Sequence, residues 1–329
     1  PGVFWVRTSR TVGAMVSSRT RPRRTWVAAV LVLVVLATCV LAPAVAQSSD
    51  YGQVVAGKIH LGNYEYPEPV VLGPIGNGDV RAVVILLHGL GGAAQGMESI
   101  FNESPFHDVR WIFPQAPMRA VQLNFGQPEP AWYDMRNLDP DDIWNDEEGI
   151  SESAEYIKQL VLQCVRGGVR ANRIILGGFS QGGAVALTTA VHKLDGIKIG
   201  GVVALSTYLP MAEQYLAGTK KITSVAKKIP FFIAHGDRDP VLAFSMGKKT
   251  EAALWGMGMT RVEFHVIRGL GHTRNAAEAG LIRDFIGRAL SEVVGEPAWL
   301  AEAAQEGASE TVAETEEQQW ERVDRVYQW

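Results

Sequence analysis

Near the middle of the chain an apolar run changes abruptly into a helix-like stretch. The run covers Arg173 to Gly177, the helix-like stretch covers Gly183 to Ala190, and between them lies Gly178-Phe179-Ser180-Gln181-Gly182. A strand that turns directly into a helix strains the backbone of the turn residue, so the residues two before and two after it must be small. Glycine occupies both positions. The pattern predicts a tight strand-to-helix turn at Ser180, although a flexible glycine-rich turn taken in isolation has the same sequence.

Short apolar runs alternate with helical patterns from about Gln53 to Val294. Several of the runs lack an alternation of apolar and polar residues, which is typical of strands covered on both faces. The expected strands cover Ala82–Leu87, Trp111–Phe113, Arg173–Leu176, Gly200–Ser206, Pro230–Ala234 and Arg261–Val266. We therefore predict an α/β fold in which a mostly parallel central sheet is flanked by helices.

Apolar residues at helical spacing predict two of the flanking helices. The first stripe consists of Ile150, Ala154, Ile157, Leu160, Val161 and Cys164. The second consists of Leu281, Ile282, Phe285, Ile286, Ala289, Leu290 and Val293. Both stripes are expected to face the sheet and to form part of the core.

Charge separates the two ends of the chain from its middle. The first 24 residues carry six Arg and no acidic residue, whereas residues 296–329 carry nine acidic residues and two Arg. We expect three parts: a leader over residues 1–46, a single α/β domain over residues 47–295, and an acidic, disordered tail over residues 296–329. One of the two cysteines lies in the leader, so the domain is expected to fold without a disulfide. The net charge of −4 and the lack of a basic cluster in the domain give no indication of nucleic-acid binding.

The leader has the order of a secretory signal peptide. Four Arg precede the uncharged run Trp26 to Ala42, and Ala44-Val45-Ala46 provides a small-x-small cleavage site. We expect the protein to enter the secretory pathway and to be secreted after cleavage. The alternative is a membrane-anchored protein, because residues 26–46, if uncleaved, just reach the roughly 20 residues that span a bilayer.

A serine at such a turn becomes a nucleophile only when a nearby base removes its proton. His272 is the candidate base, because it stands in a glycine-rich loop after the last expected strand, where parallel sheets carry their reactive groups. The imidazole in turn needs an anion. Asp237 and Asp239 both follow the strand that ends at Ala234, and spacing alone does not separate them. The order serine, aspartate, histidine is the one expected for α/β-hydrolases.

A second glycine-rich loop, His88-Gly89-Leu90-Gly91-Gly92, follows an expected strand. It resembles loops that donate one main-chain N–H to an oxyanion hole, and the second donor is expected to be the N–H of Gln181. His88 is expected to satisfy backbone groups rather than to act in the chemistry. Residues 114–132 have two interpretations: an apolar lip over an acyl-chain groove, with Trp132 in contact with the substrate, or a packed loop.

Residues from about Val54 to Val294 resemble the acyl-protein thioesterase and carboxylesterase family of α/β-hydrolases. The matching motifs, in chain order, are His88-Gly89-Leu90-Gly91, Phe113-Pro114-Gln115-Ala116-Pro117, Trp132-Tyr133-Asp134, Arg173 to Gly183, Ala204-Leu205-Ser206, Leu209-Pro210, His235 to Pro240 and Gly271-His272. Two positions depart from the family pattern. Gly92 stands where the family often has Asp, and Leu242-Ala243 replaces the common Val-Pro, so the substrate pocket is matched less closely than the chemistry.

The resemblance implies a serine hydrolase that cleaves acyl thioesters or esters without a metal or organic cofactor. Its substrates would be acylated proteins such as S-palmitoyl cysteines, or lipids. The resemblance assigns catalysis to Ser180, Asp239 and His272, and the oxyanion bonds to the N–H groups of Leu90 and Gln181. The alternatives are a lysophospholipase and, more distantly, a binding protein that kept the fold but lost the activity.

Overall fold

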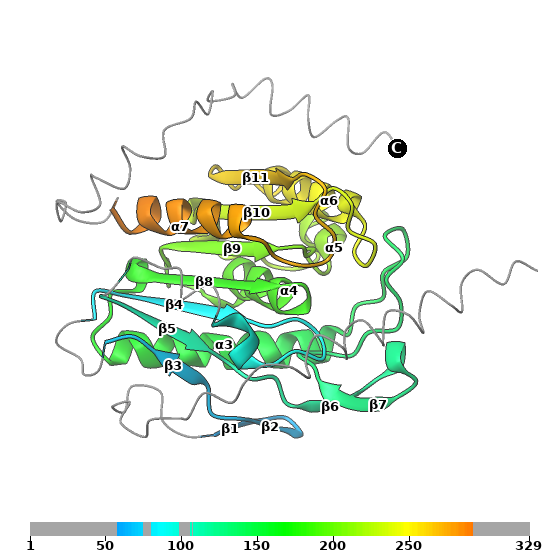
Figure 1. Cartoon of the computed structure of the whole chain (residues 1–329), viewed down its shortest axis with the longest axis horizontal. Coiled ribbons are helices and arrows are strands. Elements are labelled where there is room, and N and C mark those ends of the chain that lie inside the picture. The colour runs from blue at the N-terminus through cyan, green and yellow to red at the C-terminus, as the bar shows by residue number, and fades with distance from the viewer. Residues whose placement is uncertain (1–57, 75–79, 99–105, 107, 292–329) are drawn as a thin grey trace, which may run out of the picture.

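A seven-stranded sheet crosses the centre of the molecule in the order β11-β10-β9-β8-β4-β5-β3 (Figure 1). The computed structural model describes residues 58–74, 80–98, 106 and 108–291. The strands of the sheet are β3 (Val70–Leu72), β4 (Ala82–Leu87), β5 (Val109–Phe113), β8 (Ile174–Phe179), β9 (Gly201–Leu205), β10 (Phe231–Gly236) and β11 (Val262–Ile267). Only β3, at one edge, is antiparallel to its neighbour, so the expected mostly parallel sheet is confirmed.

The central strands are buried on both faces, which explains their continuous apolar sequence. In β4, Val83, Ile85 and Leu87 point into one core cluster, whereas Val84 and Leu86 point into the other. Two-sided burial of this kind is the reason that parallel strands lack a polar face. All six predicted strands are present, and their bounds differ from the predicted ones by no more than a few residues.

Helices cover both faces of the sheet, as the fold class requires (Figure 1). The larger core cluster receives side chains from α3 (Glu147–Arg166), α4 (Gln181–Thr188) and α6 (Phe244–Gly256). The smaller cluster receives side chains from α7 (Ala276–Ser291) and from the short 3₁₀ helix η1 (Ala94–Met97). Within these bounds, α3 and α7 contain the two predicted apolar stripes, except for Val293, which lies outside the described residues.

The remaining short elements are connections. A π-helical turn, η4 (Thr189–Lys193), extends α4, and α5 (Ala212–Leu216) precedes β10. Three further 3₁₀ turns are η2 (Gln122–Asn124), η3 (Ala171–Arg173) and η5 (Ala226–Lys228).

Two antiparallel hairpins lie outside the central sheet. One pairs β1 (Ile59–Leu61) with β2 (Tyr64–Tyr66), and the other pairs β6 (Met118–Val121) with β7 (Gln127–Pro130). The second hairpin falls within residues 114–132, for which the sequence suggested a lip or a packed loop. The hairpin has features of both interpretations, because Met118 and Phe125 are exposed whereas Val121 is buried.

The predicted leader and the predicted acidic tail lie outside the described residues, and their structure stays a prediction. Among the helices that are described, none combines the length and the apolarity needed to cross a bilayer.

Candidate active site

Ser180 lies at the turn between β8 and α4, where the glycine pattern predicts it. Its backbone has φ 54° and ψ −123°, a conformation that costs an L-residue about 1–3 kcal/mol. Close packing explains the flanking glycines: a Cβ atom on Gly178 would clash with the main chain of Gly182, and one on Gly182 would clash with the carbonyl oxygen of His88. The Ser180 N–H donates to the carbonyl of Leu205 at 2.9 Å, which ties the turn to β9.

Three loops at the carboxyl ends of parallel strands meet at this serine. The Ser180 Oγ lies 2.9 Å from Nε2 of His272, in the loop between β11 and α7. The His272 Nδ1 lies 2.7 Å from Oδ2 of Asp239, in the loop after β10. Because a carboxylate only accepts hydrogen bonds, Nδ1 carries the hydrogen and Nε2 accepts from the hydroxyl. The hydroxyl, the imidazole and the carboxylate form one hydrogen-bonded line.

The carboxylate of Asp239 is inaccessible to solvent and fully hydrogen-bonded. Its Oδ1 accepts from the main-chain N–H groups of Val241 at 2.8 Å and Leu242 at 2.9 Å. Its Oδ2 faces His272 and also lies 3.5 Å from Nε2 of His235. Burial by itself raises the pKa of Asp239, but the bonds from His235, His272 and Val241 outweigh it and hold this pKa below its usual value. Asp239 therefore stays ionised beside His272.

The neighbouring Asp237 occupies a different position. Asp237 is exposed, and its Oδ1 accepts from the main-chain N–H of Gly269 at 2.6 Å. This bond joins the loop after β10 to the loop after β11. The structure brings Asp239, and not Asp237, into contact with His272. The ambiguity that spacing leaves between these two aspartates is resolved by geometry.

The two predicted oxyanion donors belong to the loop that contains Gly89 and to the residue that follows Ser180. Within the described part of the chain, no residue accepts a hydrogen bond from the main-chain N–H of Leu90 or Gln181. The Leu90 loop passes directly beside the serine, because a Cβ atom on Gly89 would lie 3.2 Å from the Ser180 Cβ. Two unpaired N–H groups beside a nucleophile are suited to an oxygen that becomes negatively charged.

His88 has the structural role that its position at a strand end suggests. Its ring is buried, and Nδ1 donates to the Gly89 carbonyl at 2.7 Å while Nε2 accepts from the Ala116 N–H at 3.1 Å. Burial lowers the pKa of His88 to about 4, so the ring is neutral near pH 7. The neutral ring is hydrogen-bonded through both of its nitrogens and so fixes the start of the Leu90 loop.

Trp132 differs from its predicted role in substrate contact. The residue is fully buried, at 0% exposure, and its indole Nε1 donates to the His88 carbonyl at 2.8 Å. A side chain without accessible surface presents nothing to a substrate in this structure. Trp132 is therefore bonded to the Leu90 loop from the protein interior and does not line the active site.

Sequence reasoning missed three contributors to the site. The first is His235, which lies 3.5 Å from Asp239 and which the sequence marks as the first residue of the matched motif His235 to Pro240 and as a histidine in an otherwise apolar strand. The second is Thr207, whose hydroxyl donates to the Ser180 carbonyl at 2.7 Å. The third is the Gln181 side chain, because the sequence drew attention to the main chain of that residue alone. No pattern in the sequence identifies the last two.

The geometry agrees with comparisons to known proteins. Residues 75–290 match the sequence model of the phospholipase/carboxylesterase family. The acyl-protein thioesterase 1 of Yarrowia lipolytica is 36% identical over 216 residues, which are 64% of this chain and 93% of the relative. That of Emericella nidulans is 33% identical over 219 residues, which are 64% of this chain and 90% of the relative. A crystal structure of Zea mays acyl-protein thioesterase 2 superposes with a TM-score of 0.61 at 28% identity, and the match covers 69% of this chain and 100% of that one. The chain belongs to the phospholipase/carboxylesterase family of α/β-hydrolases.

Proposed function

We propose that this member of the family is a serine hydrolase that removes acyl chains from protein thioesters, with S-palmitoyl cysteine as the representative substrate. One observation carries the proposal: Ser180 Oγ, His272 and Asp239 are joined by hydrogen bonds of 2.9 and 2.7 Å. Relatives at 33–36% identity are named acyl-protein thioesterase 1, which supports the choice of substrate.

The proposed reaction is acyl transfer in two steps. In the first step the Ser180 oxygen attacks the carbonyl carbon while His272 Nε2 takes the hydroxyl proton. The negative oxygen that forms is held by the N–H groups of Leu90 and Gln181, and its collapse breaks the bond to the leaving thiolate, which takes the proton from His272. In the second step a water molecule attacks the acyl-serine by the same route and releases the fatty acid.

Replacement of the nucleophile tests the mechanism. Ser180→Ala in the full chain is expected to lower kcat on p-nitrophenyl acyl esters by about 10⁴-fold or more, since the covalent route is lost. A fluorophosphonate probe is expected to label the unmodified protein at Ser180 and to leave the variant unlabelled. Full activity of Ser180→Ala would refute the mechanism. Absence of labelling of the unmodified protein would favour a binding protein that retains the fold without activity.

A lysophospholipase is the second candidate, because the family description includes phospholipases. Both activities use the same acyl chemistry and differ only in the leaving group. Competition between a palmitoyl thioester peptide, lysophosphatidylcholine and a short-chain ester separates them. We expect the palmitoyl thioester to have the highest kcat/KM, and a higher value for lysophosphatidylcholine would reverse the assignment.

We further propose that the protein acts outside the cytosol, on the basis of the signal-like order of residues 19–46. Mass spectrometry of the N-terminus of the protein from its native source decides between the two outcomes. A start at or near Gln47 indicates cleavage and secretion, whereas retention of residues 26–46 together with membrane fractionation indicates an anchor.

A further inference from the structure

One oxyanion donor lies in the Leu90 loop and the other in the first turn of α4, and both of these are attached to the segment Pro130–Tyr133. On the Leu90 side, the indole Nε1 of Trp132 donates to the His88 carbonyl at 2.8 Å. The Pro130 carbonyl accepts from the N–H of Gly91 at 2.9 Å. These two bonds lie on either side of Leu90 in the sequence and so fix the peptide that contains its N–H.

On the other side, the segment holds the side chain of Gln181. The Gln181 Oε1 accepts from the Trp132 N–H at 2.8 Å, and Nε2 donates to the Tyr133 carbonyl at 2.7 Å. Gln181 is only 1% exposed, so its amide group is directed into the protein, away from solvent. Because both Oε1 and Nε2 are hydrogen-bonded, the side chain of Gln181 restricts the rotation of the first turn of α4. It thereby restricts the direction of the Gln181 N–H as well.

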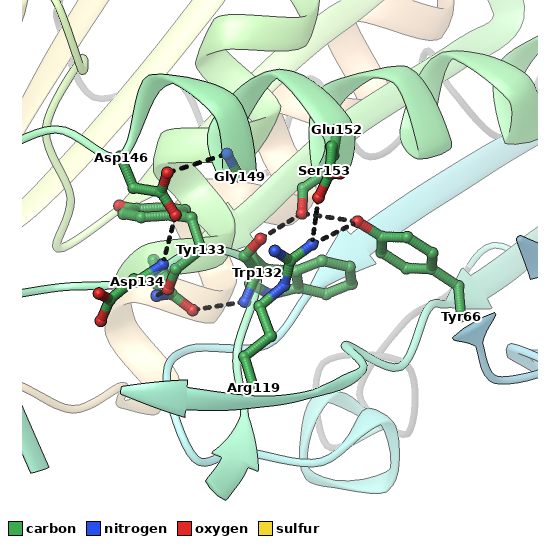
Figure 2. A network of polar contacts seen from close by, with 10 residues as sticks. Tyr66, Arg119, Trp132, Tyr133, Asp134, Asp146, Gly149, Glu152 and Ser153 are labelled. Atoms are coloured by element: carbon green, nitrogen blue, oxygen red, sulfur yellow. Dashed lines mark hydrogen bonds and ion pairs between the residues drawn. The ribbon is translucent and has the colours of Figure 1, made fainter. Parts of the chain in front are cut away.

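The segment is itself supported by a buried network shown in Figure 2. The Ser153 hydroxyl donates to the Trp132 carbonyl, and the Tyr66 hydroxyl bonds to Ser153 at 3.0 Å. Arg119 donates to the Tyr66 hydroxyl at 3.0 Å and to Glu152 at 3.1 Å. Every polar group of the Trp132 main chain is thereby bonded, which keeps the segment rigid in the interior.

We propose that Trp132 and the Gln181 side chain are positioning residues that set the separation and direction of the two oxyanion donors. The proposal rests on the proposed function, in which the N–H groups of Leu90 and Gln181 hold the oxyanion. One rigid segment bonded to both loops keeps the two N–H groups in place before the reaction begins. Preorganised donors cost no reorganisation in the transition state, and a displacement of about 1 Å can lower the rate about 10²-fold.

The test is the variant Trp132→Phe, which removes the bond to His88 and keeps an aromatic ring. We expect kcat on p-nitrophenyl acyl esters to fall by about 10- to 100-fold with KM within about 3-fold, because the donors act in the transition state. The Ki of an alkyl trifluoromethyl ketone, which forms a tetrahedral oxyanion on Ser180, is expected to rise by the same factor. The pH profile of kcat/KM is expected to stay in place, because the bonds of His272 are untouched.

Trp111→Phe is the matched control, because Trp111 is equally buried but lies in the opposite core cluster. It is expected to lower the melting temperature as Trp132→Phe does, without a change in Ki. If Trp132→Phe loses stability alone and keeps kcat and Ki within about 3-fold, the proposal is wrong. If Trp132→Phe does not fold, Gln181→Met, which keeps the main-chain N–H and the side-chain length, is held to the same criteria. Failure of the proposed function itself would show separately, as full activity of Ser180→Ala.

Discussion

At the scale of single residues, the environment of a carboxylate decides its role. Asp237 and Asp239 stand two positions apart after the same strand, yet only the Asp239 side chain is inaccessible to solvent and bonded to His272. Its two oxygens have different partners: Oδ1 accepts two main-chain N–H groups, and Oδ2 faces two imidazoles. The second oxygen is therefore the one on which the orientation of His272 depends.

This division of the two oxygens predicts a large effect of Asp239→Asn. An amide nitrogen in place of Oδ2 would face His272 Nδ1 as a donor, so the ring would adopt the tautomer with a hydrogen on Nε2 and could not accept from Ser180. We expect kcat to fall about 10⁴-fold. Asp237→Asn keeps an oxygen for the Gly269 N–H and is expected to stay within about 3-fold of the unmodified enzyme. Steady-state kinetics on p-nitrophenyl esters measure both, and equal losses would contradict the assignment.

At the scale of elements, the first turn of α7 contains a carboxyl that burial destabilises when it is ionised. Glu278 is 1% exposed, and among the described residues neither of its oxygens has a hydrogen-bond partner. Burial raises the pKa of Glu278 from 4.5 to about 7, although its electrostatic interaction with nearby Arg274 opposes the shift. The folded protein therefore binds more protons than the unfolded chain between these two pH values.

The sign of this shift predicts how stability depends on pH. A raised carboxyl pKa stabilises the fold fully below about pH 4.5, and the stabilisation is lost as the pH rises through 7. Glu278→Gln mimics the protonated form, so it is expected to match the unmodified protein at pH 5 and to exceed its free energy of unfolding at pH 8 by up to about 3 kcal/mol. Urea unfolding at both pH values measures this. Glu213→Gln, at an exposed position, is the control. An effect of Glu278→Gln that is the same at both pH values would contradict the raised pKa of Glu278.

The same scale shows what the sequence could predict and where it failed. Strands such as β4, buried on both faces, are continuous apolar runs, so pattern alone located them. The edge strand β3 and the strands of the two hairpins are only three or four residues long, which is too short for a periodicity to reveal them. The site also has a part that the sequence could predict and a part that it could not. Ser180 and His272 lie in glycine-rich motifs, which the sequence reveals. The contact of His235 with Asp239 and the burial of Trp132 arise only when the chain is folded.

At the scale of the whole molecule, the described residues close the sheet on both faces with side chains from residues 58–291. Residues 295–319 contain few large apolar residues, so we expect this part of the predicted tail to add little to the core. We therefore expect a chain of residues 47–295 to unfold in one transition, with a melting temperature within about 2 °C of that of residues 47–329 and the same kcat/KM. Calorimetry and esterase kinetics compare the two. A large loss of stability in the shorter chain would show that the tail belongs to the domain.

The pairing of β4 with β8 has a consequence for how the molecule reaches its native state. Val83 aligns with Ile174, so the strands that precede the Leu90 loop and the Ser180 turn pair although they are far apart in the sequence. Contacts of such sequence separation form slowly, because a large loop must close before they are made. On dilution from denaturant, helical signal should therefore return well before esterase turnover. A molecule arrested in that interval would leave one edge of the apolar strand β8 unpaired, and an unpaired edge promotes aggregation.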